Sequence, residues 1–305
     1  MKIMVFDVGG TEIKYSVMDE QMHRTDSGAV PTPQDTQAQF LDTVYRLYAP
    51  HKDEVSGIAM ALPGFVDNRT GYVSNGGALL YNTATPVGQL LAEKCDCPVI
   101  LENDGKAAAM AELANGALKD CCNAAVFIIG TGVGGGIIAN GQLVRGVHFT
   151  AGEYSFVNTN AEAWDAPDQN MACQCSTSNL LKWYRARKAL PEDAPLDGRS
   201  FFAAANAGEP EALEVLRRFC HAVAVQIYNL TVLLDVEKVA IGGGSKQPLL
   251  LESLRSAYNG LYASRAGQAY MEGLPRCQIV PCAFSSEANQ VGVAAAYFEA
   301  MQKKR

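Results

Sequence analysis

Apolar residues in this chain of 305 residues fall into short continuous runs and longer helical stripes, separated by glycine-rich turns. The runs predict buried strands and the stripes predict helices. Strands are predicted at 2–6, 13–18, 55–62, 98–101, 124–129, 137–139, 236–241 and 277–281, and helices at 36–50, 86–94, 107–118, 178–189, 199–206, 210–234, 248–264 and 287–302. Strands that alternate with helices in this way indicate an α/β fold.

Two of the predicted strands lead into glycine-rich turns that are each followed by another strand. The turns are Asp7–Thr11 and Gly130–Gly136. The second turn matches the G-x-G-x-x-G pattern of dinucleotide-binding proteins, but in those proteins the turn must open a helix. Here a strand follows and ends at Asn140-Gly141, a typical hairpin turn. We therefore interpret both segments as β-hairpins with glycine-rich turns. Two such hairpins indicate an internal duplication of two α/β lobes.

The first of these turns has residues that suit a phosphate. Glycine N–H groups can approach an anion closely, Thr11 adds a hydroxyl group, and Asp7 can hold a hydrated Mg²⁺ ion. An ordinary hairpin turn also uses glycines, so the local pattern leaves both interpretations open. A third glycine turn follows the strand at 236–241, and the P-loop pattern G-x-x-x-x-G-K-[ST] does not occur in the sequence.

Residues 101–112, with the sequence LENDGKAAAMAE, place two adjacent polar side chains between a predicted strand and a predicted helix. Such a junction is exposed while both flanking elements are rigid, and reacting groups are often located there. Asp104 is therefore a candidate catalytic base. The alternative is that Asn103 or Asp104 only caps the helix by accepting a backbone N–H hydrogen bond.

The composition indicates a globular protein and excludes some classes of partner. Hydrophobic residues make up 48% of the chain and charged residues 19%. The net charge is −7, and basic residues cluster only at Lys303–Arg305, so we expect no nucleic-acid partner. Met1-Lys2 leads directly into a strand pattern rather than a leader or a membrane span, so we expect no membrane association and a cytoplasmic location.

The nine cysteines are scattered along the chain, which favours reduced thiols in a reducing compartment. Two pairs have spacings that resemble metal sites: Cys95 with Cys97, and Cys173 with Cys175. A structural zinc site needs a second Cys or His pair at a suitable distance, and the chain has four histidines in all. We therefore expect no zinc site from these residues.

The segments DVGGTEIK, LPGFVD, ENDGKAAAMAE, GTGVGGGI, AGE and IGGG occur in the order in which they occur in the ROK family of repressors, open reading frames and sugar kinases. The chain resembles this family, which belongs to the actin-like ATPase superfamily, over essentially its whole length. The resemblance implies an α/β, two-lobed actin-like (ribonuclease H-like) ATPase fold with the active site in the interlobe cleft. It implies a smaller N-terminal lobe at 1–115 plus 288–305 and a larger C-terminal lobe at 116–287.

The resemblance also implies an ATP-dependent sugar kinase in which Asp104 is the general base that takes the proton from the attacking sugar hydroxyl. The implied sugar ligands are Gly64, Asn75, Asn103 and Glu153. The implied ATP-binding residues are Asp7, Gly9, Gly10, Thr11, Lys14, Thr131, Gly132, Gly134, Gly242, Gly243 and Gly244. Asp7 would hold Mg²⁺ through water, so the implied cofactors are ATP and Mg²⁺. A homodimer is the expectation from the family.

Two positions depart from the pattern of many family members. Phe156 stands where they have a histidine after the GE glutamate. The run from Cys173 lacks two of the four zinc ligands and has Lys182 in place of a sugar-binding glutamate, so the resemblance implies no structural zinc here. This layout, with its segment Ser74–Ala78, looks like the β-glucoside kinase branch, which phosphorylates a sugar 6-hydroxyl.

Several alternative functions remain open at this stage. Glucokinase and N-acetylmannosamine kinase activities of the same family are alternative predictions. Outside the enzyme class, a sugar-sensing repressor would carry a helix-turn-helix segment before the first hairpin, and here that hairpin begins at residue 2. A catalytically inactive sugar-binding protein is disfavoured by the presence of Asp7, Thr11 and Asp104.

Overall fold

A computed structural model describes residues 1–243 and 247–302 of the chain. These residues form two compact units. Unit 1 consists of Met1–Gly116, Leu143–Ala151 and the range that begins at Ser286, and unit 2 consists of Ala117–Gln142 and Gly152–Ser285. Each unit combines a β-sheet with helices, which confirms the predicted α/β class.

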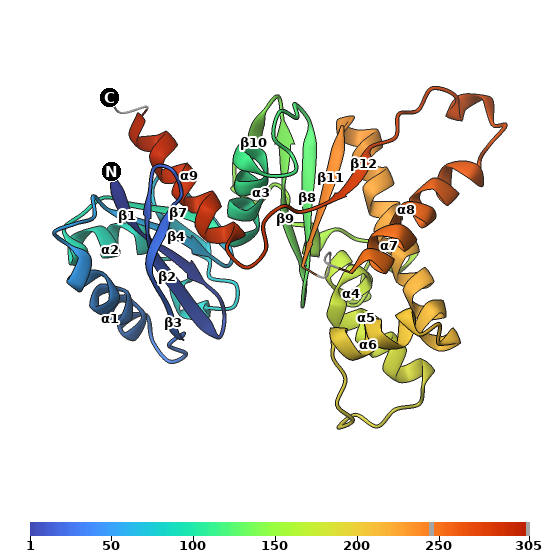
Figure 1. Cartoon of the computed structure of the whole chain (residues 1–305), viewed down its shortest axis with the longest axis horizontal. Helices are drawn as coiled ribbons and strands as arrows, with labels where there is room; N and C mark the ends of the chain where they lie inside the picture. Colours follow the sequence, from blue (N-terminus) through green and yellow to red (C-terminus); the bar gives the residue numbers. More distant parts are fainter. Residues whose placement is uncertain (244–246, 303–305) are drawn as a thin grey trace. The chain divides into compact units, whose positions relative to one another are not determined.

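Unit 1 contains a five-stranded sheet in the order β3-β2-β1-β4-β7 (Figure 1). It also contains a separate hairpin, β5-β6. β1 runs antiparallel to β2 and parallel to β4, and β4 runs parallel to β7. Every residue of β4 is buried, as expected for a central strand of a parallel sheet. The bounds are β1 Lys2–Val8, β2 Glu12–Asp19, β3 Arg24–Pro31, β4 Ile58–Leu62, β5 Phe65–Asp67, β6 Tyr72–Asn75 and β7 Val99–Asn103.

The helices of unit 1 follow the predicted stripes. The first helix begins after Thr36, whose hydroxyl oxygen accepts the N–H of Gln39, and it buries Phe40, Val44 and Tyr48. The bounds are α1 Gln37–Tyr48, α2 Val87–Cys95, α3 Asp104–Asn115 and α9 Ala288–Gln302, with short 3₁₀ helices η1 Ala49–His51 and η2 Leu80–Asn82. α9 packs so closely on α3 that a Cβ added at Gly292 would overlap with the backbone of Ala107.

The sheet of unit 2 repeats the plan of the first one, in the order β10-β9-β8-β11-β12. β8 runs antiparallel to β9 and parallel to β11, and β11 runs parallel to β12. In both sheets a hairpin is therefore followed by two parallel strands, as the predicted internal duplication requires. The bounds are β8 Ala124–Ile129, β9 Val133–Ala139, β10 Gln142–Val144, β11 Lys238–Gly243 and β12 Gln278–Pro281.

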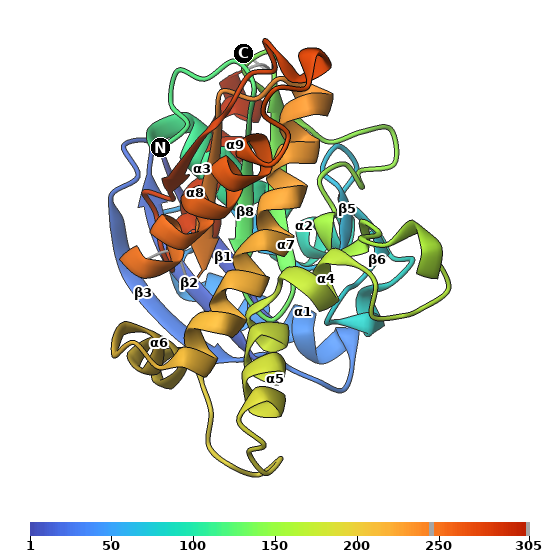
Figure 2. The same cartoon turned by 90° about the vertical axis from the view of Figure 1, so that its right-hand side faces the viewer.

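The helices of unit 2 build most of its apolar core. The longest, α7, lies beside α8, and both begin with a proline at the first helical position (Figure 2). Thr231 of α7 and Tyr258 of α8 share a buried hydrogen bond of 3.1 Å between their hydroxyl groups. The bounds are α4 Met171–Cys175, α5 Thr177–Arg187, α6 Gly198–Asn206, α7 Pro210–Leu234 and α8 Pro248–Ala263, with η3 Tyr154–Phe156, η4 Ala161–Ala163 and η6 Ala269–Met271.

The structure confirms the hairpin interpretation of the second glycine turn. A strand, β9, follows that turn, and it ends at Asn140 and Gly141, whose φ angles of 54° and 70° are those of a two-residue hairpin turn. The pattern missed β3 because most of its residues are exposed and polar, and it missed β5 and β6 because each has at most four residues. Within residues 1–243 and 247–302, the helices are too short or too polar to span a lipid bilayer.

Candidate active site

The junction between β7 and α3 holds the two polar residues that the sequence singles out. Asn103 ends β7 and is the N-cap of α3, since its Oδ1 accepts the backbone N–H of Lys106 at 3.0 Å. Its Nδ2 donates to the carbonyl oxygen of Gly64 at 2.9 Å, and the residue is 5% exposed. The capping interpretation therefore holds for Asn103. Asp104 occupies the first position of the helix itself.

Asp104 is partly exposed, and its Oδ1 accepts the N–H of Gly105 at 2.7 Å. Its backbone is fixed by β7 on one side and by the capped first turn of α3 on the other. A carboxylate held in this way, with access to solvent, can accept a proton from a hydroxyl group that binds beside it.

Gly64 connects this junction to the hairpin β5-β6. Its φ is +93°, and a Cβ there would overlap with the carbonyl oxygen of Asn75 and approach the nitrogen of Gly77 to 2.8 Å, so only glycine fits. Asn75 ends β6, and its Oδ1 accepts the N–H of Gly77 at 2.8 Å. The structure therefore brings together Gly64, Asn75 and Asn103, the predicted sugar ligands of unit 1.

The hairpin of β1 and β2 carries the residues predicted to bind phosphate and Mg²⁺ in unit 1: Asp7 near the end of β1, Gly9, Gly10 and Thr11 in the turn, and Lys14 near the start of β2. The Oδ1 of Asp7 accepts a hydrogen bond of 2.9 Å from Nδ2 of Asn289. Burial raises the pKa of Asp7, and the Asn289 hydrogen bond and the charge of Lys14 only partly oppose this. A hard oxygen donor whose charge is poorly solvated is a group that a bound cation would stabilise, so Asp7 fits a magnesium site.

Two residues that the sequence analysis missed hold this turn in place. The Oγ1 of Thr32 donates to the carbonyl oxygen of Gly9 at 2.8 Å, and Nε2 of Gln34 donates to that of Gly10 at 2.7 Å. The N–H of Gly9 donates to the carbonyl oxygen of Glu12 at 2.9 Å. Gly9 therefore uses its N–H inside the turn. Thr32 and Gln34 follow β3, the strand that the pattern did not reveal.

Glu153 lies in unit 2 immediately before two residues that are bonded to β9. The hydroxyl of Tyr154 donates to the carbonyl oxygen of Gly136 at 3.0 Å, and Oγ of Ser155 accepts the N–H of Val133 at 3.2 Å. The same hydroxyl of Ser155 donates to the carbonyl oxygen of Val133 at 3.0 Å. These bonds fix the Glu153 segment beside the glycine turn that carries the predicted ATP ligands Thr131, Gly132 and Gly134.

The predicted adenosine residues Gly242 and Gly243 end β11. A Cβ at Gly242 would overlap with the side chain of Ile128, and a Cβ at Gly243, where φ is +76°, would overlap with the backbone of Ile129. Both glycines thus allow the close approach of β11 to β8, and the two glycine turns of unit 2 begin at the same edge of its sheet. Gly244 lies outside the described residues.

A buried ion pair next to the candidate base is a feature that the sequence analysis missed. Glu102 on β7 is 0% exposed; its Oε2 accepts a hydrogen bond of 2.8 Å from Nε of Arg145 and forms an ion pair with Nη2, also at 2.8 Å. Burial raises the pKa of Glu102, and the positive charge of Arg145 opposes that shift. A charged residue inside an apolar strand was the available signal, since a buried charge requires a partner.

Of the two cysteine pairs with metal-like spacing, Cys173 and Cys175 lie on α4, and Cys95 ends α2 two residues before Cys97. Cys175 is 1% exposed within the apolar core, and burial raises its pKa to about 12. The Sγ of Cys173 is 3.7 Å from the carbonyl oxygen of Pro167. A protonated thiol buried among apolar side chains is typical of a structural cysteine.

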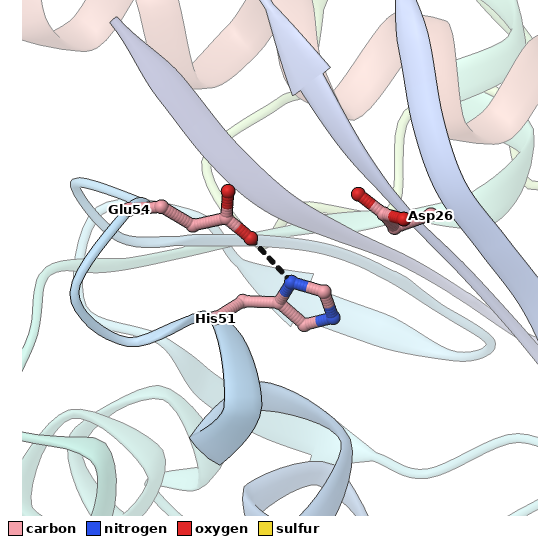
Figure 3. A group of neighbouring side chains, drawn as sticks. All are labelled: Asp26, His51 and Glu54. Atoms are coloured by element: carbon pink, nitrogen blue, oxygen red, sulfur yellow. Dashed lines mark hydrogen bonds and ion pairs between the residues drawn. The ribbon is translucent and has the colours of Figure 1, made fainter.

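One surface cluster does contain ligand-type side chains close together: Asp26, His51 and Glu54, with their ligand atoms within 4.8 Å of one another (Figure 3). The Nδ1 of His51 already pairs with Oε1 of Glu54 at 2.5 Å. The ammonium group of Lys2 lies 3.9 Å from the other oxygen of Glu54 and would repel a cation. We therefore interpret this cluster as a surface ion-pair group.

The chain is similar to known proteins over most of its length. The model of the ROK family matches residues 3–302. A β-glucoside kinase of Listeria innocua is 30% identical over 258 residues, which cover 84% of this chain and 87% of that protein. An N-acetyl-D-glucosamine kinase of Vibrio atlanticus is 30% identical over 266 residues, which cover 78% of this chain and 83% of that protein.

The solved structures give the same result for the fold. A ROK family protein from Streptococcus pneumoniae in complex with sucrose has a TM-score of 0.86 to this chain at 28% identity, and the match covers 99% of this chain and 100% of the other. This likeness confirms the predicted fold class, the α/β fold with two actin-like lobes.

Proposed function

This chain belongs to the ROK family, and on that premise we propose that it transfers the γ-phosphate of ATP to the 6-hydroxyl of a glucose-type sugar or β-glucoside. The enzyme class is that of a sugar phosphotransferase, as in the related kinases. One observation supports the residue assignment above all others. Asn103 caps α3 and binds Gly64, so that Asp104 stands at the first helical position beside the predicted sugar ligands.

In the proposed reaction, the sugar hydroxyl oxygen attacks the γ-phosphorus and its proton passes to the carboxylate of Asp104. The bond between the γ-phosphorus and the β–γ bridging oxygen breaks, and ADP leaves. One carboxylate within hydrogen-bond reach of the hydroxyl is sufficient as a base, because phosphoryl transfer depends mainly on positioning and charge neutralisation. In this proposal Gly64, Asn75, Asn103 and Glu153 bind the other sugar hydroxyls.

The proposal assigns the ATP phosphates to the glycine turns of both units. In unit 1 the ligands are Gly10, Thr11 and Lys14, and in unit 2 they are Thr131, Gly132 and Gly134, with Gly242 and Gly243 on the adenosine side. Gly9 contributes its small size, since its N–H is bonded within the turn. Asp7 holds Mg²⁺ through water, and the ion, when bound, supplies positive charge that neutralises the phosphates.

The identity of the acceptor is the finer part of the proposal. A β-glucoside acceptor is supported by the likeness to the Listeria innocua enzyme, while the Vibrio atlanticus relative is named for a monosaccharide. We also propose a cytoplasmic homodimer that needs no structural zinc. Light scattering on the purified protein tests the dimer.

An ADP-release assay over a sugar panel tests the function. The panel contains cellobiose, gentiobiose, an aryl β-glucoside, glucose, N-acetylglucosamine and N-acetylmannosamine. We expect turnover with ATP, and the highest kcat/KM for the β-glucosides. If glucose or an N-acetylated sugar is phosphorylated while the disaccharides are not, the acceptor assignment is wrong. If ADP release stays at the rate without sugar for every acceptor, the kinase assignment is wrong.

A further inference from the structure

Glu102 is a fully buried carboxylate for which the proposed reaction has no use. It lies on β7 two residues before Asp104, and its Oε1 accepts the N–H of Asn103 at 3.1 Å. Its Oε2 accepts the hydrogen bond from Nε of Arg145 and forms the ion pair with Nη2, and it also accepts a hydrogen bond of 3.5 Å from Nδ2 of Asn68. Because an unpaired buried charge is strongly destabilising, the guanidinium group of Arg145 stabilises this carboxylate at the end of β7.

Arg145 reaches Glu102 from a segment whose neighbours along the chain belong to unit 2. The segment Leu143–Ala151 packs with unit 1, and the N–H of Ala151 donates to the carbonyl oxygen of Arg145 at 3.2 Å, which closes the segment into a loop. The Nη2 of Arg145 also lies 3.4 Å from Sδ of Met110 on α3. Arg145 therefore contacts the strand before Asp104 and the helix that begins with it.

The same loop has a second attachment, to the hairpin that begins after Gly64. The guanidinium group of Arg69 lies over the ring of Phe149, with 4.8 Å between Cζ and the ring centroid. Arg69 is oriented by Asp67, whose Oδ1 accepts its Nε–H at 3.4 Å. The loop is thus fixed to β7 through Arg145 and to the hairpin β5-β6 through Phe149. Both of these elements carry predicted sugar ligands.

The loop leads directly to the remaining predicted sugar ligand. Ala151 is followed by Gly152, with φ of +78°, and then by Glu153. Only one residue therefore separates Glu153 from the end of a loop that is anchored on the strand carrying Asn103. We propose that Arg145 is a positioning residue for the sugar, because its ion pair with Glu102 joins the strand end before Asp104 to the loop that leads to Glu153.

This inference rests on the proposed kinase function and specifies a consequence for it. The described contacts of Arg145 are with β7 and α3, whereas the phosphate ligands of unit 1 lie on the hairpin of β1 and β2. Loss of Arg145 therefore weakens binding and turnover of the sugar, while the KM for ATP stays close to that of the wild type.

Four variants test the inference: Arg145→Met, Arg145→Lys, Glu102→Gln and the double variant Arg145→Met/Glu102→Gln. Steady-state kinetics give KM for the sugar and for ATP, and thermal unfolding reports stability. We expect Arg145→Met to lower kcat/KM for the sugar about 10- to 100-fold, as misplacement of binding groups by about 1 Å does, with KM for ATP changed less than about twofold. Arg145→Lys keeps one charged contact and recovers part of the loss.

The double variant separates positioning from folding. It removes both charges of the pair, so neither is left buried without the other, and its unfolding temperature should exceed that of Arg145→Met. Its kcat/KM for the sugar should nevertheless stay low. Wild-type sugar kinetics in the folded double variant, or equal changes in the KM values for sugar and ATP, would overturn the inference. Asp42→Asn, which breaks the surface ion pair with Lys94, is the control. A wild-type protein without turnover would instead refute the proposed function.

Discussion

Asn103 and Gly64 are joined by a hydrogen bond of 2.9 Å from the side-chain amide of the first to the carbonyl oxygen of the second. The same side chain caps α3 through the N–H of Lys106. One buried amide therefore links the end of β7, the start of α3 and the residue that begins the hairpin β5-β6. Glycine alone fits at position 64. The backbone conformation therefore fixes the positions of both residues that form this hydrogen bond.

Replacement of Asn103 by alanine should lower both stability and activity. The variant loses the helix cap, which costs about 1 kcal/mol, and the bond to Gly64, so kcat/KM for the sugar should fall at least about tenfold. Urea unfolding and the ADP-release assay measure the two effects. Thr36→Ala is the matched control, because it removes the cap of α1 and should destabilise the protein without changing the kinetics. Equal kinetics in the two variants would contradict the role of Asn103 in the site.

Replacement of Asp104 by alanine or asparagine should lower kcat by several orders of magnitude, with the affinity for sugar much less changed. A positioned general base contributes about 10²- to 10⁴-fold, and removal of the charge beside the reacting hydroxyl adds to that loss. The helix cap should be kept in both variants, because Asn103 provides it. Single-turnover kinetics at saturating ATP measure the chemical step. Turnover close to that of the wild type would show that Asp104 is structural.

The local pattern of the sequence was sufficient for most of the fold, and it singled out Asp104 and the first glycine turn, whereas the other candidate site residues came from the family resemblance. The glycine turn at 130–136 could be assigned to a hairpin because its flanking strands and the Asn140-Gly141 turn are local signals. The partners of the site could not be predicted. Arg145 is 43 residues from Glu102 and Asn289 is 282 residues from Asp7, and contacts at such distances depend on how the chain folds. A charged residue in an apolar strand signals that a partner exists, but single-sequence patterns do not identify that partner.

Replacement of Asp7 by asparagine should abolish activity with MgATP and yet preserve or increase stability at pH 7. Burial raises the pKa of Asp7, so the folded chain binds its proton more tightly than the unfolded chain does. Stability from this group is therefore greatest below the unfolded pKa, about 4, and is lost as pH rises through the folded pKa. Asparagine at position 7 does not titrate, so this loss of stability with rising pH disappears. Its side-chain oxygen can still accept the hydrogen bond from Asn289.

Urea unfolding of the wild type and Asp7→Asn between pH 4 and 8 checks this sign. The difference in free energy of unfolding should favour the variant at pH 7, by about 1 kcal/mol, and should shrink as the pH falls. Asp42→Asn, at an exposed position, should show little difference over the same range. A variant of Asp7 that is less stable at pH 7 than at pH 4, relative to the wild type, would contradict the prediction.

The purified protein should contain no stoichiometric zinc, and EDTA should not change its unfolding temperature. The run from Cys173 lacks two of the four ligands of the zinc-binding pattern, and Cys175 is 1% exposed within the apolar core. Elemental analysis of protein prepared without chelator gives the metal content. A thiol reagent provides a second check, since the exposed Cys122 should react in the native state and Cys175 only after unfolding. One zinc per chain would disprove the prediction.

The same substitution at two helical glycines should have opposite effects on stability. Gly260 of α8 has no atom within 4 Å of an added Cβ, so alanine should stabilise the protein by about 0.5–1 kcal/mol through its higher helix propensity. Gly292 of α9 faces the backbone of Ala107 on α3, and a Cβ there would overlap with its carbonyl oxygen. Alanine must push α9 away from α3, at a cost of about 1–3 kcal/mol.

The substitution at Gly292 should also affect catalysis, because Ala107 lies in the first turn of the helix that begins with Asp104. A shift of that turn by about 1 Å would displace the base and lower kcat well beyond the effect of any unfolded fraction. Urea unfolding and kinetics at a temperature where both variants are fully folded separate the two contributions. If Gly292→Ala were as stable and as active as Gly260→Ala, α9 could not pack against α3 as the structure has it. Another element would then have to hold the helix that begins with Asp104 in place.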